Sequence, residues 1–502
     1  MKKLLSAILL MAMVLGLLVG CSKQPEGKEE EQERVREVFY GENGEIPCLE
    51  LTDLVYDTAD IVKWEFTEMG TDEEDGLPYG YADMSISQED ADIFNWYYGD
   101  GVYLTRYVKP AADAYMVLLE EMQKKGYQIY STGTLNNGDV QYTLLTYQDF
   151  VYDVIYCLTG NTLTVTASKA RPLSPYLLEN NPSTQSQAVE GLETTLTMLS
   201  WQTSGGDNYI IQLKNGHFIL FDGGAHHMFR QALDFMKANT PDGQTPVVEA
   251  WFITHGHYDH VGWTRAYTYA PEKNGNLFYE GEAAESLIVN GIYYNMPDEY
   301  IIDNTIYSWR VSVPTTSATG MRTKNENLWP YRVAEAAQYM KTEDGQQTPI
   351  YRPQTGQTFY FKDLTVEVPY TQEHITFGEY QMDINASSTW YLVRAEGKIF
   401  LDGGDTEDVN LLHVRSMYTG DYGCYNADIM SAFHHGHNIY SEHIDSFHAP
   451  IVFYTSKTMF SWASQYTQAN KDMLAFPGTT YYCYGDGAYQ YHFATGEVTE
   501  LG

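Results

Sequence analysis

The first thing this chain lacks is positive charge. It has 30 lysines and arginines against 67 aspartates and glutamates, a formal net charge of −37 at pH 7. Such an excess of acid repels phosphate backbones and anionic lipid head groups, and binding long nucleic acid would need a basic groove of which the sequence gives no sign. We therefore expect no nucleic-acid partner, and we interpret the acidic residues as the solvated surface of an exposed protein.

Cysteine is also scarce, at 5 of 502 residues. The four that follow Cys21 are scattered and form no Cys-x-x-Cys pair: Cys48, Cys157, Cys424 and Cys483. This spacing excludes a zinc knuckle and a dense disulfide framework as the basis of the fold. One disulfide inside each domain stays open, because the sequence alone does not decide pairing.

The N-terminus has the pattern of an export signal. Lys2 and Lys3 precede an apolar stretch from Leu4 to Gly20, which is short for a membrane span and typical of a secretory signal. The stretch ends in Leu-Val-Gly-Cys, which resembles the lipobox of bacterial lipoproteins. That resemblance implies a signal peptide over residues 1–20 and a lipid on Cys21, which would anchor the protein to the outer face of the bacterial cell membrane. An uncleaved N-terminal helix would give the same location.

The length of 502 residues predicts two domains plus tails. Residues 21–36 are rich in Glu, Lys and Gln and are expected to form a flexible tether. Residues 37–175 predict a small α+β domain of unknown role, in which an amphipathic helix over 110–125 precedes an antiparallel meander. A spacer, a partner-binding module and a substrate-binding module all stay open for it. A polar linker over 176–189 then leads to a second domain, 190–502.

The nine residues 254–262, Thr-His-Gly-His-Tyr-Asp-His-Val-Gly, contain three of the 14 histidines of the chain. They follow the run 247–253, which is β-branched and aromatic enough to be a buried strand. The alternative, ordinary surface histidines, is disfavoured because so dense a cluster directly after an apolar strand is improbable by chance. The pattern indicates a metal site at a strand end.

The spacing within this motif suggests two metal positions. His255 and His257 lie two residues apart, so an extended backbone places both imidazoles on one face. Asp259 and His260 follow the turn and are candidates for a second ion. Imidazole and carboxylate suit zinc, with iron and manganese as alternatives, and such sites leave a coordination position open for water.

The motif resembles the signature of the metallo-β-lactamase-fold hydrolases, in which Asp259 and His260 match ligands of the second metal. The resemblance covers most of the C-terminal two thirds. It implies an α/β fold, the four-layer αββα sandwich, with metals at one edge between the sheets. Upstream, an apolar strand ends in Asp222 followed by two glycines, as in similar proteins. Asp222 is either a turn former or a group that braces a ligand, and the two roles are compatible.

A second group of motifs resembles one branch of that family, the branch related to the hydrolase domain of the DNA-uptake channel protein. Asn385-x-x-Ser388, a strand and the pair Gly404-Asp405 follow one another. The resemblance implies that Asp405 bridges both metals, and Asp402 is its rival. We prefer Asp405, because the glycines before it would supply the sharp exit from the strand that a bridging carboxylate needs.

The last predicted ligand lies in the segment 434–437, His-His-Gly-His, which resembles the final motif of the same branch. Neighbours on a strand point to opposite faces, so we expect one of His434 and His435 to be a ligand and the other to contact substrate. We choose His435. Many family members have a further histidine before the bridging aspartate. Here only His374 lies in that interval, without the usual context. Without it, the first ion has two histidines and the bridge.

Together these patterns predict a secreted, lipid-anchored metal-dependent hydrolase with two zinc ions. A metal-bound hydroxide would attack an ester or phosphodiester of a small molecule or of cell-envelope material. Asp405 would orient the hydroxide, and the second metal, held by Asp259, His260 and His435, would stabilise the leaving group. The alternative is a non-catalytic ligand- or partner-binding lipoprotein with a degenerate structural metal site. Substrate, metal identity and oligomeric state do not follow from the sequence.

Overall fold

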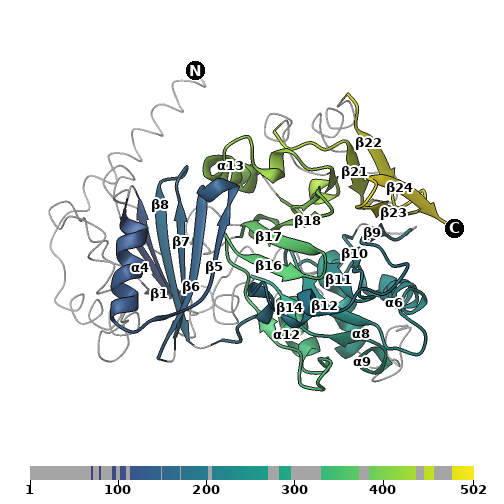
Figure 1. Cartoon of the computed structure of the whole chain (residues 1–502), viewed down its shortest axis with the longest axis horizontal. Coiled ribbons are helices and arrows are strands. Elements are labelled where there is room, and N and C mark those ends of the chain that lie inside the picture. The colour runs from purple at the N-terminus through teal and green to yellow at the C-terminus, as the bar shows by residue number, and fades with distance from the viewer. Residues whose placement is uncertain are drawn as a thin grey trace.

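The described part of the chain consists of an N-terminal sheet and a larger C-terminal sandwich (Figure 1). The computed structural model describes residues 69–71, 78–80, 93–97, 102–108, 113–148, 150–169, 171–201, 206–268, 282–295, 329–371, 384–406, 408–436, 446–456 and 477–502. The predicted signal peptide, Cys21 and the tether lie outside these residues. Within them, no helix has the length and apolar character needed to cross a membrane.

The N-terminal part is an antiparallel sheet backed by helix α4 (Ala114–Lys124). Its strands, in the spatial order β3-β4-β8-β7-β6-β5, are β3 (Ile93–Tyr97), β4 (Val102–Val108), β8 (Thr162–Lys169), β7 (Phe150–Cys157), β6 (Val140–Tyr147) and β5 (Gln128–Leu135). Leu118 and Met122 of the helix share a buried cluster with Tyr152 and Val165 of the sheet. The predicted amphipathic helix and the meander of β5 to β8 are confirmed.

The first sheet of the sandwich has the order β15-β14-β12-β11-β10-β9-β23-β24, with β13 also paired to β12. Its strands are β9 (Thr195–Met198), β10 (Tyr209–Gln212), β11 (Phe218–Phe221), β12 (Val247–Phe252), β13 (Ile288–Val289), β14 (Ile292–Tyr293), β15 (Ile350–Tyr351), β23 (Ala488–His492) and β24 (Glu497–Leu501). Pairing is antiparallel from β9 to β11 and parallel from β11 through β12 and β14 to β15.

The second sheet repeats this plan in the order β16 to β22. Its strands are β16 (Thr358–Phe361), β17 (Leu364–Tyr370), β18 (Trp390–Ala395), β19 (Lys398–Asp402), β20 (Ile429–Ser431), β21 (Ile451–Tyr454) and β22 (Thr480–Cys483). Pairing is antiparallel up to β19 and parallel from β19 to β22. The two halves of the sandwich are therefore built alike.

Strand β18 shows how the layers form. Tyr391 and Val393 point into the core between the two sheets, whereas Trp390 and Leu392 point to the opposite face, as the two-residue period of a strand requires. Helices α6 (Phe229–Ala238) and α12 (Trp329–Ala337) pack on the first sheet, and α13 (Asp408–Met417) packs on the second (Figure 1). The order is helix, sheet, sheet, helix, which is the predicted four-layer αββα sandwich.

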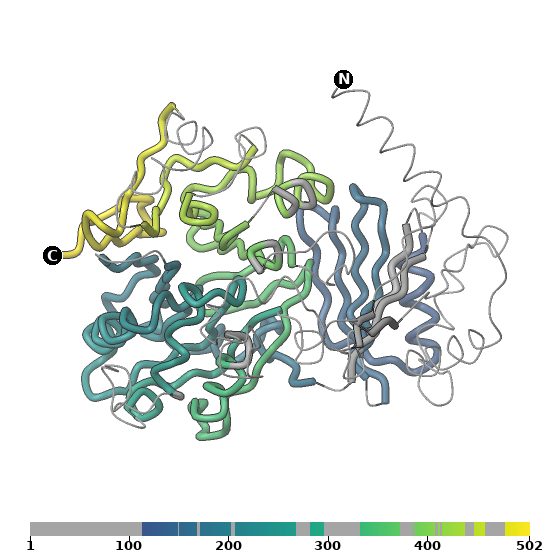
Figure 2. Tube along the Cα trace, turned by 180° about the vertical axis from the view of Figure 1, so that it is seen from behind, coloured from purple at the N-terminus to yellow at the C-terminus, as the bar shows by residue number. Residues whose placement is uncertain are grey.

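The N-terminal sheet lies against the second sheet of the sandwich, as both Figure 1 and Figure 2 show. The face of this sheet that is turned away from α4 shares a buried cluster with Trp390 of the second sheet. In this contact Gln357 Nε2 donates a hydrogen bond of 2.7 Å to the hydroxyl of Tyr142, which in turn donates one of 2.5 Å to the buried carboxylate of Asp153. Arg171 forms an ion pair with the same carboxylate. The contact between the two parts is thus a buried apolar cluster that contains a network of hydrogen bonds and one ion pair.

Both sheets end at the same edge of the sandwich. The hydroxyl of Tyr391 donates to the carbonyl of Ile253 at 3.0 Å, and the amide of Thr389 donates to the carbonyl of Thr254 at 2.9 Å. These two bonds hold the carboxyl end of β12 against the second sheet. Because β11, β12, β19 and β20 run with their carboxyl ends toward this edge, the residues that follow them meet there.

Candidate metal centre

The first motif occupies the turn after β12 and the short helix α7 (Tyr258–Val261). The side chains of His255 and His260 are completely buried, while those of His257 and Asp259 are partly exposed. Nε2 of His255 lies 3.0 Å from Nδ1 of His257, so the two imidazoles do share one side of the turn. Half of the motif therefore faces the protein interior and half faces the solvent.

Asp405 follows the glycine turn at the end of β19. Gly404 has a φ of +54°, and a Cβ built on it would lie 2.5 Å from Oγ1 of Thr254. Only glycine allows the turn to pack directly on the residue that precedes His255. The sharp exit expected from the sequence is present, and it brings Asp405 onto the first motif.

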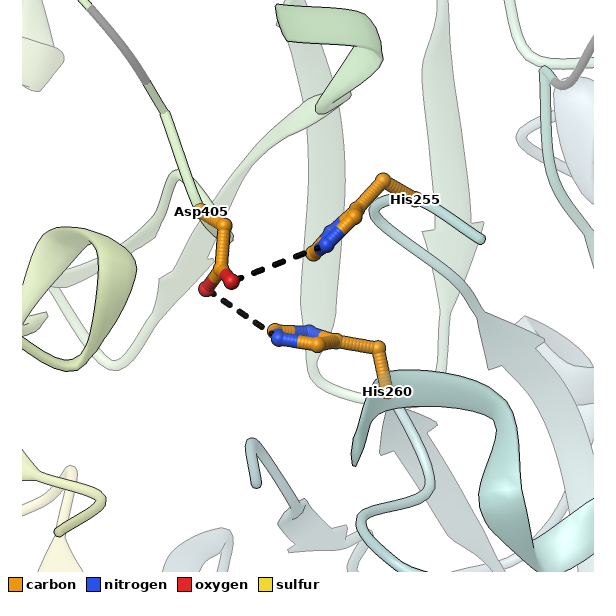
Figure 3. A group of neighbouring side chains, drawn as sticks. All are labelled: His255, His260 and Asp405. Atoms are coloured by element: carbon orange, nitrogen blue, oxygen red, sulfur yellow. Dashed lines mark ion pairs between the residues drawn. The ribbon is translucent and has the colours of Figure 1, made fainter. Parts of the chain in front are cut away.

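The carboxylate of Asp405 lies among four imidazoles. Its Oδ1 is 3.1 Å from Nε2 of His260 and 3.3 Å from Nε2 of His435. Its Oδ2 is 3.7 Å from Nε2 of His255 and also 3.7 Å from Nε2 of His434. Figure 3 shows the carboxylate facing the rings of His255 and His260, which follow a strand of the other sheet. Each oxygen of one carboxylate thus faces two ring nitrogens.

The rival carboxylate, Asp402, lies deeper and is engaged by other groups. Its Oδ1 accepts hydrogen bonds from the amide of Gly404 at 3.1 Å and from the hydroxyl of Ser431 at 2.9 Å. Burial raises the pKa of Asp402 well above its usual range, and the carboxylates of Asp222 and Asp207 raise it further.

The pKa of Asp405 is shifted in the opposite direction, to lower values. Burial alone would raise its pKa, but the surrounding imidazoles outweigh that effect and hold the pKa well below its usual range. The low pKa favours the ionised form of Asp405, which is the form that a metal ligand requires.

The segment with the paired histidines corrects one step of the sequence argument. His434 and His435 lie not on a strand but in the 3₁₀ turn η8 (Phe433–Gly436), and each has a φ of 51°. The alternation expected of a strand does not apply in this left-handed backbone. Both imidazoles consequently approach Asp405, rather than one of the two.

Asp222 braces the first motif. Its Oδ1 accepts a hydrogen bond from the amide of Thr254 and its Oδ2 one from the hydroxyl of the same residue, each at 2.7 Å. Nδ1 of His260 lies 2.7 Å from Oδ2 as well. Of the two roles considered for Asp222, the structure shows the bracing one, and its φ of +55° shows that it also forms the turn.

Asp207 was missed in the sequence. It lies just before β10 and is completely buried. Its Oδ1 accepts a hydrogen bond from the hydroxyl of Thr455 and lies 3.4 Å from Nδ1 of His435. The sequence does contain a pattern that points to Asp207: it is a carboxylate next to glycines beside an apolar strand, as Asp222 and Asp405 are.

The donor set fits a metal ion. Four groups of described side chains have ligand atoms within 4.8 Å of one another. One of them, Asp259, His260 and His435, is the set predicted for the second metal, whereas the group around His255 and Asp405 contains His260 in place of the predicted His257. The other two groups include Asp207. Nε2 of His260 lies 3.3 Å from Nε2 of His435, and ring nitrogens that face each other this closely are typical of a site made for a cation. Imidazole and carboxylate donors suit zinc.

Some predicted residues are not placed. His374 and the last histidine of the segment 434–437 lie outside the described residues. The described cysteines Cys157, Cys424 and Cys483 are buried and form no disulfide with one another.

Comparisons with known proteins add a fold-level likeness. No family model and no curated protein matches the chain. Among solved structures, the metallo-β-lactamase-fold protein YhfI from Bacillus subtilis is 11% identical, with 53% of this chain and 86% of that chain covered and a TM-score of 0.27. Zinc-bound PqqB from Methylobacterium extorquens is 12% identical, with 47% and 71% covered and a TM-score of 0.26. A variant of CmlA β-hydroxylase is 12% identical, with 62% and 55% covered and a TM-score of 0.31.

The chain has the metallo-β-lactamase fold. Its two sheets repeat one plan between outer helices, and the histidine motif stands at the carboxyl end of β12.

Proposed function

We propose that this protein is a metal-dependent hydrolase whose centre is built around Asp405. The observation that carries the proposal is the convergence of four imidazoles on one ionised carboxylate at the edge where both sheets end. Zinc bound there would supply a Lewis acid and would lower the pKa of a water molecule to about 7. Two zinc ions are the proposed complement, with manganese or iron as alternatives.

The protein's own residues would position the reaction. Asp405 and the buried imidazoles of His255 and His260 form the closed floor of the site. The side chain of Asp259 is 35% exposed, so the site is open on this side and a substrate would approach over Asp259 and His257. Asp405 would orient the attacking water, because its two oxygens face both predicted metal positions.

The proposed substrate class is an ester or phosphodiester, of a small molecule or of cell-envelope material, and we propose that the enzyme acts outside the cell. The support is the lipobox-like sequence that ends at Cys21, which would anchor the mature protein by lipid to the outer face of the membrane. The acidic charge of −37 disfavours a nucleic-acid substrate.

The first test is the metal content of protein that lacks residues 1–21, with hydrolysis of a bis-aryl phosphodiester and an aryl ester measured on the same samples. We expect two equivalents of metal, one or none in Asp405→Ala, and loss of hydrolysis in Asp405→Ala and His255→Ala. His492→Ala, on β23 and outside the groups of metal-ligand candidates, is the matched histidine control and should bind metal and turn over substrate as wild type does.

Two results would count against the hydrolase and favour the alternative, a non-catalytic binding lipoprotein. Bound metal without turnover of either substrate supports a ligand-binding lipoprotein with a structural metal site. No metal, even after reconstitution, means that the motif is a relic and removes the hydrolase proposal.

A further inference from the structure

We infer that His434 is a ligand of the first metal position and supplies the imidazole that the family's usual motif would have supplied elsewhere. The inference rests on the proposed function only in so far as the centre binds metal. It gives the chain two positions that share Asp405. The first would be formed by His255, His257 and His434, and the second by Asp259, His260 and His435.

The two oxygens of Asp405 divide the imidazoles into these sets. The nitrogens on Oδ1, those of His260 and His435, also lie near Asp259, whose Oδ2 is 3.6 Å from Nε2 of His435. The nitrogens on Oδ2 are those of His255 and His434, both at 3.7 Å. His434 is therefore on the side of the carboxylate that belongs to the first position.

His257 belongs to the same side. Its Nδ1 lies 3.0 Å from Nε2 of His255, the nitrogen that faces Oδ2 of Asp405. His255, His257 and His434 therefore lie on one side of Asp405, and a zinc ion bound there would draw their ring nitrogens together without any contribution from His374.

The backbone around His434 is arranged for this placement. His434 and His435 each have a φ of 51°, a left-handed backbone that is unfavourable for residues other than glycine. Strain of this kind gathers at functional sites. The amide of His434 donates a hydrogen bond of 2.9 Å to the carbonyl of Gly404, the residue before Asp405. The turn that carries His434 is thereby tied to the turn that carries the carboxylate.

Asn385 completes the surroundings of the ring. Its Nδ2 lies 3.3 Å from Nε2 of His434, the same nitrogen that faces Asp405, so the amide would give up this contact when the nitrogen binds a metal ion. The Asn-x-x-Ser motif of the sequence therefore lies at the first metal position. Since only 13% of the side chain of His434 is exposed, the ring is held inside the site and not presented on its rim.

The test compares His434→Asn with His435→Asn. Asparagine tolerates a positive φ, so both variants keep the backbone of the turn, and circular dichroism with thermal unfolding checks this. Zinc content is measured by elemental analysis. Cobalt-substituted protein is followed by its visible absorption, which reports the ligands of each ion. Neither readout depends on turnover, so a failed hydrolase proposal and a failed ligand assignment are separate results.

We expect each single variant to fall from two equivalents to one, with a different cobalt band lost in each. His255→Ala combined with His434→Asn should retain the same single equivalent, since both residues serve one position. The combination of His434→Asn with His435→Asn should bind none. The inference is overturned if His434→Asn keeps two equivalents with unchanged cobalt absorption, which would make the residue a substrate contact, or if wild-type protein binds no metal.

Discussion

Nδ1 of His260 lies 2.7 Å from the carboxylate of Asp222, and both side chains are completely buried. An ionised carboxylate only accepts, so the Nδ1–H of His260 donates to Asp222, and this bond turns Nε2 of the ring toward Asp405. At His435, Nδ1 lies 2.9 Å from the hydroxyl of Thr455, and that hydroxyl donates to the buried carboxylate of Asp207. Two buried carboxylates therefore orient two of the predicted ligands, a common arrangement around metal-binding histidines.

This relationship predicts the effect of Asp222→Asn. Asparagine tolerates the φ of +55° at this position, so the turn should survive, but the charge that holds His260 is lost. We expect metal affinity to fall by about 10- to 100-fold, measured by competition with a chromophoric zinc chelator. An unchanged affinity would show that Asp222 serves only the turn.

Gly436 ends the turn that carries the paired histidines, and Gly436→Ala should destabilise the protein. Its φ is +83°, and an added Cβ would lie 2.1 Å from the hydroxyl oxygen of Tyr454. We expect a loss of about 2–4 kcal/mol in the free energy of unfolding, from the left-handed backbone and the clash together.

The matched control is Gly345→Ala. Its φ is +77°, but no atom lies within 4 Å of the added Cβ, so only the backbone cost of about 1–2 kcal/mol should appear in urea unfolding. Equal losses in the two variants would contradict a steric role for Tyr454.

The contact between the N-terminal sheet and the sandwich depends on Arg171. Its partner Asp153 is completely buried, and Arg171→Met would leave that carboxylate without its charged partner. We expect a loss of about 3–5 kcal/mol in urea unfolding. Lys214→Met removes the exposed ion pair with Glu396 and should cost less than about 1 kcal/mol. A small effect of Arg171→Met would mean that the pair contributes little to the junction.

We predict that stability depends on pH through His217, which lies directly before β11, at the end of the first sheet away from the metal centre. Burial works to lower the pKa of His217, but its hydrogen bond of 2.9 Å to Glu249 and the charge of that carboxylate outweigh burial and raise it. A raised histidine pKa contributes stability that is fully present below the unfolded value of about 6.5 and is lost as the pH rises through the folded pKa.

The measurement is urea unfolding of wild type and His217→Gln at pH 5.5 and pH 8.5. We expect the substitution to cost about 1–2 kcal/mol at the lower pH and less at the higher one. A cost that is the same at both values, or larger at pH 8.5, would contradict the assigned direction.

Much of the fold was predictable because its signals are local. The run before His255 is β-branched and aromatic, so β12 and the position of the motif at its end followed from propensity and periodicity. The same holds for α4 and for the meander of the N-terminal sheet. The choice of Asp405 over Asp402 also had a local basis, since the intervening glycines predict the turn that carries the carboxylate away from the strand.

What the sequence by itself determined is therefore which residues form strands, and which ligand types stand at their ends. Only the tertiary structure decided which side chains meet. Asp207 and Thr455 lie 248 positions apart in the chain, and their contact with His435 depends on the pairing of whole sheets. The left-handed backbone of His434 and His435 is likewise unfavourable in isolation, so no local propensity predicts it, and it persists because the packed edge of the sandwich holds it in place.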